Sequence, residues 1–208
     1  MTDIEKRFLQ LALGLEAILF GEFTLKSGRE SLYFFNIATF LESGHLGELA
    51  EMYSEKITKC NVDYDVIFGP SYKGIPLAAA VATVLNQKAS KKIPICFDRK
   101  EEKEHGEGGA LVGSVKNKKV LIIDDVLTAG TALKNSIKLI QEAGGTISAA
   151  LIALDRQEQD EGEQVSKKLV NELNIPIFSI SNLENLVLYL ETSDKRGIAK
   201  KLKASLKS

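Results

Sequence analysis

Cysteine and histidine are scarce in this sequence. Its 208 residues include two cysteines, Cys60 and Cys96, and two histidines, His45 and His105. No two of these four residues stand at the spacing of a zinc site, so we expect no structural zinc. The two cysteines could form one disulfide, although a pair of reduced thiols is ordinary in a cytoplasmic enzyme.

A long uninterrupted apolar segment is also missing. Residues 8–20 carry Gln10 and Glu16, and the hydrophobic region of a secretory leader would not contain that glutamate. No apolar run approaches the length of about 20 residues that crosses a bilayer. We therefore expect a soluble protein that stays in the cytoplasm and has no membrane partner.

Neither sign of charge dominates. Lysine and arginine total 27 and aspartate and glutamate total 28, which gives a formal net charge of −1. Without a strong positive field, nucleic acid is a poor candidate partner. Apolar residues make up 44% and charged residues 26%, which excludes collagen-like, disordered and disulfide-scaffold proteins.

The hydrophobic pattern predicts an α/β fold. Residues 4–20 have helical spacing, 23–36 resemble a hairpin, and 45–59 again have helical spacing. Short apolar runs then alternate with helical stretches, which favours a central parallel sheet flanked by helices. The runs are residues 65–68, 93–97, 120–123, 147–154 and 177–180, and the helices are expected at about 75–88, 130–143 and 160–173.

Polar groups follow four of the apolar runs, at the edge of an open α/β sheet where ligands bind. The four segments are Gly69-Pro70-Ser71-Tyr72-Lys73-Gly74, Asp98-Arg99-Lys100, Asp124-Asp125-Val126-Leu127-Thr128-Ala129-Gly130-Thr131 and Asp155-Arg156.

The segment that follows residue 123 carries the most information. Its threonine- and glycine-containing turn opens a helix, whose N-terminal N–H groups suit a phosphate. Asp124 and Asp125 are suited to accept hydrogen bonds from vicinal sugar hydroxyls, so a phosphorylated sugar would satisfy both halves. The alternative is a plain helix cap by Thr128 with two incidental acids, although unpaired buried carboxylates are costly. Neither a Walker loop nor a G-x-G-x-x-G motif is present.

Residues 120–131 resemble the phosphoribosyl-pyrophosphate (PRPP) motif of the type I phosphoribosyltransferases. Residues 23–36, 69–74 and 99–109, together with Arg156, are similar to the orotate-using members of that family. The resemblance implies transfer of the 5-phosphoribosyl group from PRPP to N1 of orotate. The products would be orotidine 5′-phosphate and pyrophosphate, as in de novo pyrimidine biosynthesis.

The resemblance also implies an organisation. The chain would be one domain with the type I phosphoribosyltransferase fold. Residues 1–40 would form a helix-plus-hairpin hood, 60–180 the PRPP-binding core, and 181–208 a C-terminal helical segment. A homodimer is expected, with residues 99–109 forming a lid shared across subunits. Gly106, Gly108 and Gly109 give that lid its flexibility.

Each functional role falls on residues that match the family pattern. Catalytic roles are implied for Lys26, Lys100, Lys103, His105, Asp124 and Asp125. PRPP contacts are implied for Lys26, Tyr72, Lys73, Arg99, Lys100, Lys103, His105, Asp124, Asp125, Val126, Leu127, Thr128, Ala129, Gly130, Thr131 and Ala132. Orotate contacts are implied for Lys26, Phe34, Phe35, Thr128 and Arg156. Mg²⁺ is the expected cofactor, held mainly by PRPP oxygens and water, with Asp124 or Asp125 reaching it through water.

Some of these roles have simple structural alternatives. Adjacent strand residues point to opposite faces, so at most one of the Phe34 and Phe35 rings faces a ligand. Arg156 could instead form an ion pair at the strand end with Asp155 or Glu158. The composition of residues 98–107 alone would suit a solvated surface loop, and Lys73 could be a solvated lysine. Either Lys103 or His105 could protonate the pyrophosphate.

Two further functions remain open. The acceptor could be a purine or another pyrimidine, although the hairpin and Arg156 favour orotate. A PRPP-sensing regulator without catalysis is the alternative from another class, but no helix-turn-helix segment precedes the sheet. The basic tail, residues 194–208, has Ile198, Leu202 and Leu206 at helical spacing, which favours a C-terminal helix over a membrane contact.

Overall fold

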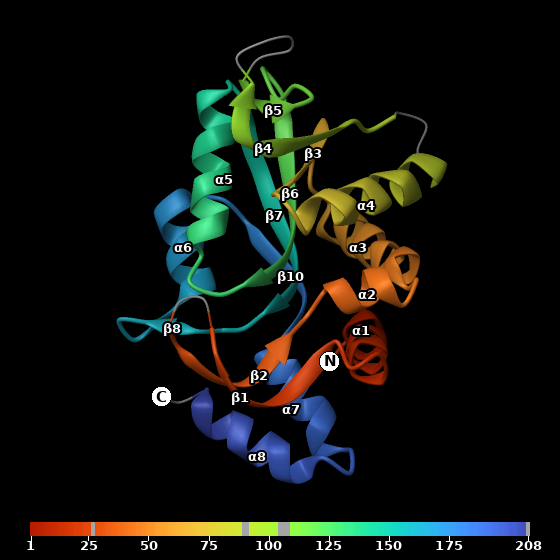
Figure 1. Ribbon diagram of the computed structural model, residues 1–208, viewed down its shortest axis with the longest axis vertical. Coiled ribbons are helices and arrows are strands. Elements are labelled where there is room, and N and C mark those ends of the chain that lie inside the picture. Colours follow the sequence, from red (N-terminus) through yellow and green to blue (C-terminus); the bar gives the residue numbers. More distant parts are fainter. Residues whose placement is uncertain (26–27, 89–91, 104–108, 207–208) are drawn as a thin grey trace.

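The computed structural model describes all residues except 26–27, 89–91, 104–108 and 207–208 (Figure 1). The helices are α1 (Asp3–Gly14), α2 (Ala38–Glu42), α3 (Leu46–Cys60), α4 (Gly74–Lys88), α5 (Thr131–Glu142), α6 (Val165–Leu173), α7 (Leu183–Glu191) and α8 (Arg196–Ser205). The strands are β1 (Ile18–Thr24), β2 (Glu30–Phe35), β3 (Val66–Gly69), β4 (Ile95–Lys103), β5 (Gly109–Val112), β6 (Lys119–Leu127), β7 (Thr146–Asp155), β8 (Gln159–Asp160), β9 (Glu163–Gln164) and β10 (Ile177–Asn182).

The central sheet has the strand order β10-β7-β6-β3-β4-β5. Its first five strands are parallel, and β5 pairs antiparallel with β4 at the edge. All five apolar runs of the sequence lie in the five parallel strands. The predicted α/β fold with a parallel central sheet is confirmed, and β5 is an addition to it.

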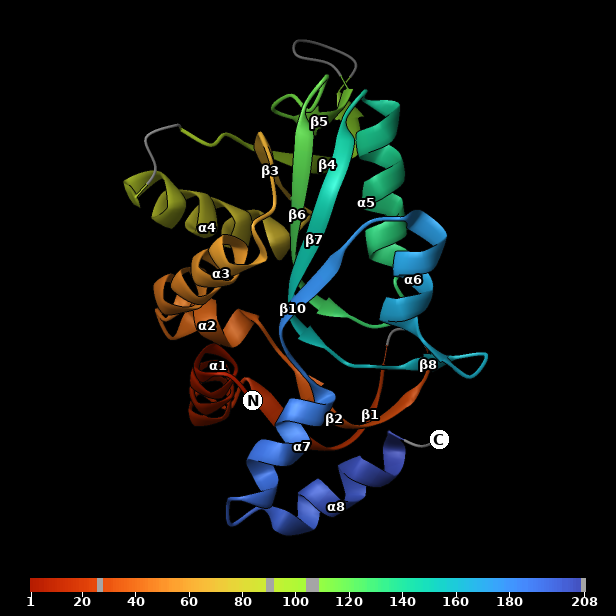
Figure 2. The same cartoon turned by 180° about the vertical axis from the view of Figure 1, so that it is seen from behind.

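Both faces of the sheet are covered, because alternate residues of its central strands face opposite helical layers. Leu121 and Ile123 of β6 belong to the larger hydrophobic cluster with α1, α3, α4 and α7. Val120 and Ile122 belong to a second cluster with α5 and α6. Figures 1 and 2 show α5 and α6 on one side of the strands and α3 and α4 on the other.

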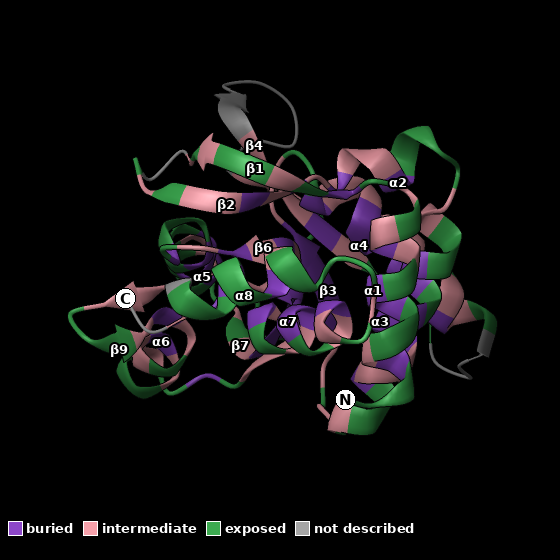
Figure 3. Cartoon of the chain, turned by 90° about the horizontal axis from the view of Figure 1, so that it is seen from below, coloured by how far each residue is buried: buried purple, intermediate pink, exposed green. Residues whose placement is uncertain are grey.

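The N-terminal helix and the β1–β2 hairpin pack on the larger cluster. The ring of Phe8 in α1 lies 6.0 Å from that of Phe35 in β2 and 6.4 Å from that of Phe40 in α2. Seen from below in Figure 3, buried residues gather between α1, α3 and α7, and exposed residues mark the outer faces of α1 and α8. The hairpin is therefore anchored by aromatic side chains on its inner face.

The prediction for residues 4–20 was partly wrong. The helix ends at Gly14, and residues 18–20 already lie in β1, which precedes the expected start of the hairpin. Glu16 adopts a left-handed conformation with φ of 56°, and the Ala17 N–H donates to the Ala12 carbonyl. That turn ends the helix, so the continued spacing of Leu15 and Leu19 did not indicate helix.

The helix expected at 160–173 begins only at Val165. Residues 159–164 form the small β8–β9 hairpin, in which Glu161 and Gly162 have φ of 53° and 84°. Two successive positive φ values are typical of the tight turn that joins antiparallel strands. Residues 98–103 likewise continue β4, so this part of the expected loop is strand. The helix α2 was not predicted, and α7 lies within residues 181–208, for which a helical segment was expected.

The basic tail forms the helix α8, as its spacing predicted. Ala199 and Leu202 are buried, and Ile198 and Leu206 pack partly against the same cluster as α7. The apolar stripe is thus used within the fold. Among the described residues, no helix combines the length and apolar character that a membrane crossing requires.

Gly69 sets the spacing between β3 and α4. A Cβ at this position would overlap the Gly74 carbonyl oxygen and lie 2.7 Å from the Ala78 Cβ. We predict that Gly69→Ala lowers the free energy of unfolding by about 1–3 kcal/mol, because the helix must move from the strand. Urea denaturation measures this change. The matched control is Gly47→Ala in α3, where an added Cβ meets nothing within 4 Å. Equal stability of the two variants would contradict the prediction.

Candidate functional site

The polar segments identified in the sequence meet at one edge of the sheet. The Lys73 turn and Arg156 follow β3 and β7, whereas Asp98-Arg99 and Asp124-Asp125 lie within β4 and β6. These four strands are consecutive neighbours in the order β7-β6-β3-β4. Because these strands are parallel, their carboxyl ends lie at the same edge. The predicted convergence of the Lys73 turn, Asp98-Arg99, Asp124-Asp125 and Arg156 is therefore present in the fold.

The turn between β6 and α5 forms the first part of the site. Gly130 precedes α5 with φ of 78°, a conformation that favours glycine, and no side chain caps the helix. Thr128 is therefore not a capping residue, which removes the simpler interpretation of this turn. The uncapped N–H groups of the first helical turn can donate hydrogen bonds to a bound anion.

Other residues of this segment differ in exposure. Val126 and Thr128 are half-buried, and Leu127 is buried in the smaller hydrophobic cluster. Ala129, Thr131 and Ala132 are exposed. The side chain of Leu127 therefore packs in the core, and only its backbone can take part in the predicted PRPP contact.

Asp124 and Asp125 lie side by side before that turn. The Asp125 N–H donates to Asp124 Oδ1 at 2.9 Å, and the Val126 N–H donates to Asp125 Oδ1 at 2.9 Å. The hydroxyl of buried Tyr53 in α3 donates to the Asp124 carbonyl at 2.6 Å. This bond ties the backbone at Asp124 to α3. Both carboxyl groups are thus held in place by local hydrogen bonds.

The two carboxyl groups are hard to ionise together. Burial, followed by the charge of Asp125, raises the pKa of Asp124 to about 8. Burial also raises the pKa of Asp125, and the Lys73 ammonium opposes that rise. Lys73 Nζ lies 3.8 Å from Asp125 Oδ2. The site therefore has a deficit of positive charge that a bound cation or hydroxyl donors would relieve.

Lys73 lies in a turn that Asp98 holds, a residue that the sequence placed at a strand end but to which no role was assigned. The Ser71 N–H donates to Asp98 Oδ1 at 2.6 Å, and the Ser71 hydroxyl donates to Asp98 Oδ2. The Ser71–Tyr72 peptide bond is cis, and the Tyr72 side chain is 63% exposed. Asp98 thus connects the end of β4 to the β3–α4 turn. Its position directly after an apolar run was the available signal.

Arg156 lies at the other end of the site. It is 5% exposed, its Nε donates to Glu158 Oε1 at 2.8 Å, and its Nη2 donates to Ser31 Oγ at 2.6 Å. Its guanidinium carbon is 4.2 Å from the centre of the Tyr33 ring. The ion pair with Glu158 considered from the sequence is present. It leaves part of the guanidinium for other partners.

The two phenylalanines of β2 face opposite ways. Phe35 is 3% exposed and packs among Phe8 and Phe40, so its ring cannot contact a ligand. Phe34 is half-buried, with its ring 5.7 Å from that of Phe23. Strand alternation turns the Phe35 ring into the core, as the structural alternative for this pair anticipated, so the predicted orotate contact of Phe35 can involve only its backbone. Phe34 remains a candidate.

Of the remaining predicted basic residues, the structure describes Arg99 fully and only the backbone of Lys100 and Lys103. Arg99 is half-buried on β4. Lys100 and Lys103 lie on the same strand, and Lys103 pairs with Gly109 in β5, but their side chains are outside what the structure describes. Lys26 and His105 lie outside the described residues altogether.

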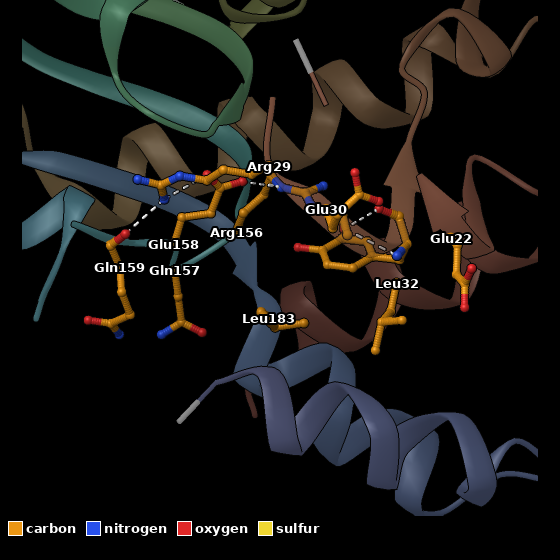
Figure 4. A pocket seen from close by; sticks show the side chains of 11 residues that line it. Glu22, Arg29, Glu30, Leu32, Arg156, Gln157, Glu158, Gln159 and Leu183 are labelled. Carbon is orange, nitrogen blue, oxygen red and sulfur yellow. Dashed lines mark hydrogen bonds and ion pairs between the residues drawn. The ribbon is translucent and has the colours of Figure 1, made fainter. Parts of the chain in front are cut away.

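A pocket of about 660 Å³ adjoins Arg156. It lies between the β1–β2 hairpin, the segment after β7 and the start of α7 (Figure 4). Arg29, Tyr33, Arg156 and Glu158 are among its lining residues, whereas Asp124 and Asp125 are not. The pocket therefore belongs to the hairpin side of the site.

The side chains that the structure describes at this site are suited to bind Mg²⁺ only through water molecules. Among the residues that the structure describes, no three His, Cys, Asp or Glu side chains converge as a metal site. Asp124 and Asp125 offer adjacent carboxylate oxygens, the donor type that Mg²⁺ accepts, often through water. The raised pKa of both groups fits a place where a divalent cation would be favourable.

The raised pKa of Asp124 predicts a pH-dependent stability. The folded state binds the Asp124 proton more tightly than the unfolded state does, so stability falls as pH rises from about 4 to about 8. Asp124→Asn should flatten this slope and gain stability relative to the original chain at pH 8. Urea denaturation at several pH values, without PRPP or Mg²⁺, measures the effect. Asp194→Asn, at an exposed position, is the control. Identical slopes for Asp124→Asn and the original chain would refute the assignment.

Known proteins resemble this chain over almost its whole length. A family model described as a phosphoribosyl transferase domain matches residues 42–182. Orotate phosphoribosyltransferase of Cellvibrio japonicus is 47% identical over 192 residues, covering 92% of this chain and 89% of the relative. The enzyme of the same name from Salmonella newport is 42% identical over 205 residues, covering 98% and 95%.

Solved structures agree with this relationship. The crystal structure of orotate phosphoribosyltransferase from Francisella tularensis has a TM-score of 0.81 and 40% sequence identity, and the match covers 95% of this chain and 96% of that one. The type I phosphoribosyltransferase fold expected from residues 120–131 is thereby confirmed. From its sequence, its sheet and these similarities, the chain belongs to the orotate phosphoribosyltransferase family.

Proposed function

We propose that the site at the carboxyl edge of the sheet transfers the 5-phosphoribosyl group from PRPP to N1 of orotate. The products are orotidine 5′-phosphate and pyrophosphate, as in pyrimidine biosynthesis. One observation carries the proposal: a pair of fixed carboxylates is followed directly by an uncapped helix N-terminus. The carboxylates can accept hydrogen bonds from the ribose hydroxyls, and the helix N-terminus can bind the phosphate, so together they match the two ends of a ribose 5-phosphate.

PRPP binds across this edge. The N–H groups of residues 128–131 receive the 5-phosphate, and Asp124 and Asp125 accept from the ribose hydroxyls. Lys73 neutralises the pyrophosphate. Its position beside Asp125 supports this role, because it lies next to the carboxylates that bind the ribose. Tyr72 lies in the same turn. PRPP is strongly anionic, so Arg99, Lys100 and Lys103 supply further positive charge.

Orotate binds on the hairpin side. Arg156 donates to the planar, anionic acceptor. Thr128 approaches the same ring from residues 124–131, which we call the PRPP loop. The Phe34 ring and the neighbouring backbone form an apolar seat for the pyrimidine. The family resemblance assigns Lys26 to both orotate and PRPP. The burial of Arg156 beside a 660 Å³ pocket supports the assignment.

Catalysis consists mainly of positioning. The bond from C1 to pyrophosphate breaks with oxocarbenium character, and N1 of orotate forms the new bond to C1 from the hairpin side while the N1 proton passes to water. The carboxylates of Asp124 and Asp125 favour the positive charge that develops on the ribose. Lys103 or His105 donates a proton to the departing pyrophosphate. Asp124 or Asp125 would hold Mg²⁺ through water, and the bound ion would supply positive charge to the pyrophosphate.

The enzyme acts as a homodimer in the cytoplasm. Residues 99–109 close over PRPP in the neighbouring subunit and exclude water, which would hydrolyse the activated sugar. The antiparallel pairing of β4 with β5, at the edge of the sheet, supports this role. Residues 1–40 act as the hood over the 60–180 core, and residues 181–208 form a C-terminal helical segment within one domain.

Orotate consumption with PRPP and Mg²⁺ tests the reaction. We expect orotate absorbance to fall only when both PRPP and Mg²⁺ are present, because each supplies a necessary part of the substrate complex. Parallel reactions contain adenine, hypoxanthine or uracil in place of orotate. Consumption of one of these bases, and not of orotate, would show that this base is the acceptor. Tight PRPP binding without consumption of any base would favour a sensor.

Mixing two variants tests lid exchange. Lys100→Ala should lower kcat about a hundredfold or more without unfolding the protein, because it removes charge stabilisation from the departing pyrophosphate. Asp125→Asn should also be inactive. After subunit exchange, mixed dimers should regain part of the activity, since each contains one site with both original residues. The matched control is Lys138→Ala on the exposed face of α5, which should keep full activity. Absence of recovery after demonstrated exchange would rule out a shared lid.

A further inference from the structure

We propose that Glu158 is a positioning residue that orients Arg156 toward the acceptor. It does so as the centre of an ion-pair bridge to Arg29 on the hairpin. The inference rests on the proposed contact between Arg156 and orotate. It adds two residues, Glu158 and Arg29, which the sequence patterns did not assign to the site.

Glu158 accepts from both arginines. Its Oε1 receives Arg156 Nε at 2.8 Å, and its Oε2 receives Arg29 Nη1 at 3.3 Å. Arg29 Nη1 also donates to the Gln159 carbonyl at 2.7 Å. Figure 4 shows the Glu158 carboxylate between the two guanidinium groups, with the dashed lines on either side. One carboxylate therefore ties the hairpin to the segment after β7.

The bridge leaves a defined edge of Arg156 for a ligand. Nε is taken by Glu158, one Nη2 hydrogen is taken by Ser31, and the flat face lies on Tyr33. Within the described part of the chain, no acceptor is bonded to Nη1 of Arg156, and a guanidinium has five N–H donors in all. The remaining donors thus have a fixed direction beside the pocket.

The backbone that carries Glu158 is itself fixed. Gln157 has a left-handed φ of 52°, its N–H donates to Asp155 Oδ1 at 2.8 Å, and its side-chain oxygen accepts from the Glu184 N–H at 2.8 Å. The Arg156 N–H donates to the Leu127 carbonyl in the PRPP loop at 3.3 Å. The bridge is therefore built on a segment that connects the PRPP loop to α7.

Charge and orientation make opposite predictions for Glu158. A carboxylate beside Arg156 weakens the attraction for an anionic acceptor, so its removal would tighten orotate binding if charge dominated. If orientation dominates, removal leaves Arg156 with several directions and weakens orotate binding. Arg156 and Glu158 are 5% and 12% exposed, so their geometry is confined by packing. We therefore expect orientation to dominate.

The test is the steady-state kinetics of Glu158→Gln and Arg29→Gln. Glutamine keeps the shape of Glu158 but places an NH2 donor at one of the two oxygen positions, so one of the two arginines loses its acceptor. We expect the KM for orotate to rise about tenfold or more in each variant, and the KM for PRPP to stay within about twofold. The double variant should be no worse than the more affected single variant, since both changes break the same bridge.

Two further variants separate geometry from charge and from general stability. Glu158→Asp keeps the charge but is too short to span both arginines, so its orotate KM should rise as in Glu158→Gln. Glu55→Gln is the matched control, because Glu55 also accepts from two cations, Arg7 at 3.0 Å and Lys59 at 2.7 Å, on α1 and α3. It should leave both KM values unchanged. Urea denaturation identifies the conditions in which every variant is folded.

The outcomes are distinct. An orotate KM that is unchanged or lower in Glu158→Gln overturns the inference while leaving the proposed reaction intact. An equal rise in the KM for orotate and for PRPP also overturns it, because that pattern indicates general damage. Absence of turnover in the original chain overturns the proposed function, and this inference with it. A selective rise in the orotate KM in Glu158→Gln, Glu158→Asp and Arg29→Gln supports it.

Discussion

The site depends on the placement of β6 between β7 and β3. Residues 120–123 are buried on both faces of the sheet, so this strand cannot shift without exposing apolar side chains to water. Its carboxyl end therefore presents Asp124 and Asp125 at a fixed height beside the Lys73 turn. The hydroxyl of Tyr53 reaches across from α3 to the Asp124 carbonyl and holds the same point from the helical layer.

Electrostatics then explain why this edge suits a charged sugar donor. Burial and then the charge of neighbouring Asp125 raise the pKa of Asp124, and Lys73 lies beside Asp125. The N-terminus of α5 has the opposite character, since its N–H groups lack a side-chain cap. Acceptors for hydroxyls and donors for phosphate are thus separated by only a short turn, residues 128–130.

The acceptor side is assembled from distant parts of the chain. Arg156 contacts Ser31 and Tyr33, and Glu158 contacts Arg29, so the segment after β7 is joined to the hairpin. Phe35 anchors the hairpin from its other face by packing in the core. The hood is therefore attached by apolar contacts on one side and by an ion-pair network at the pocket. This arrangement couples hairpin position to the orientation of Arg156.

Much of the fold, and the chemistry at each strand end, could be predicted from the sequence alone. The five parallel strands, the helices α3, α4 and α5, and the PRPP motif were all predictable, because periodicity and residue spacing are local properties. Helix ends were less predictable, since the turn at Glu16 depends on backbone conformation rather than on hydrophobicity. The β8–β9 hairpin was missed for the same reason.

Only the tertiary structure decided which predicted side chains meet. It turned the Phe35 ring into the core, joined Asp98 to Ser71, and placed Arg29 beside Glu158. These contacts join residues that are far apart in the sequence, and no local pattern encodes such a distance. The sequence determined the types of chemistry at each strand end. Strand order and packing decided their arrangement, because burial of both sheet faces selects one set of neighbours.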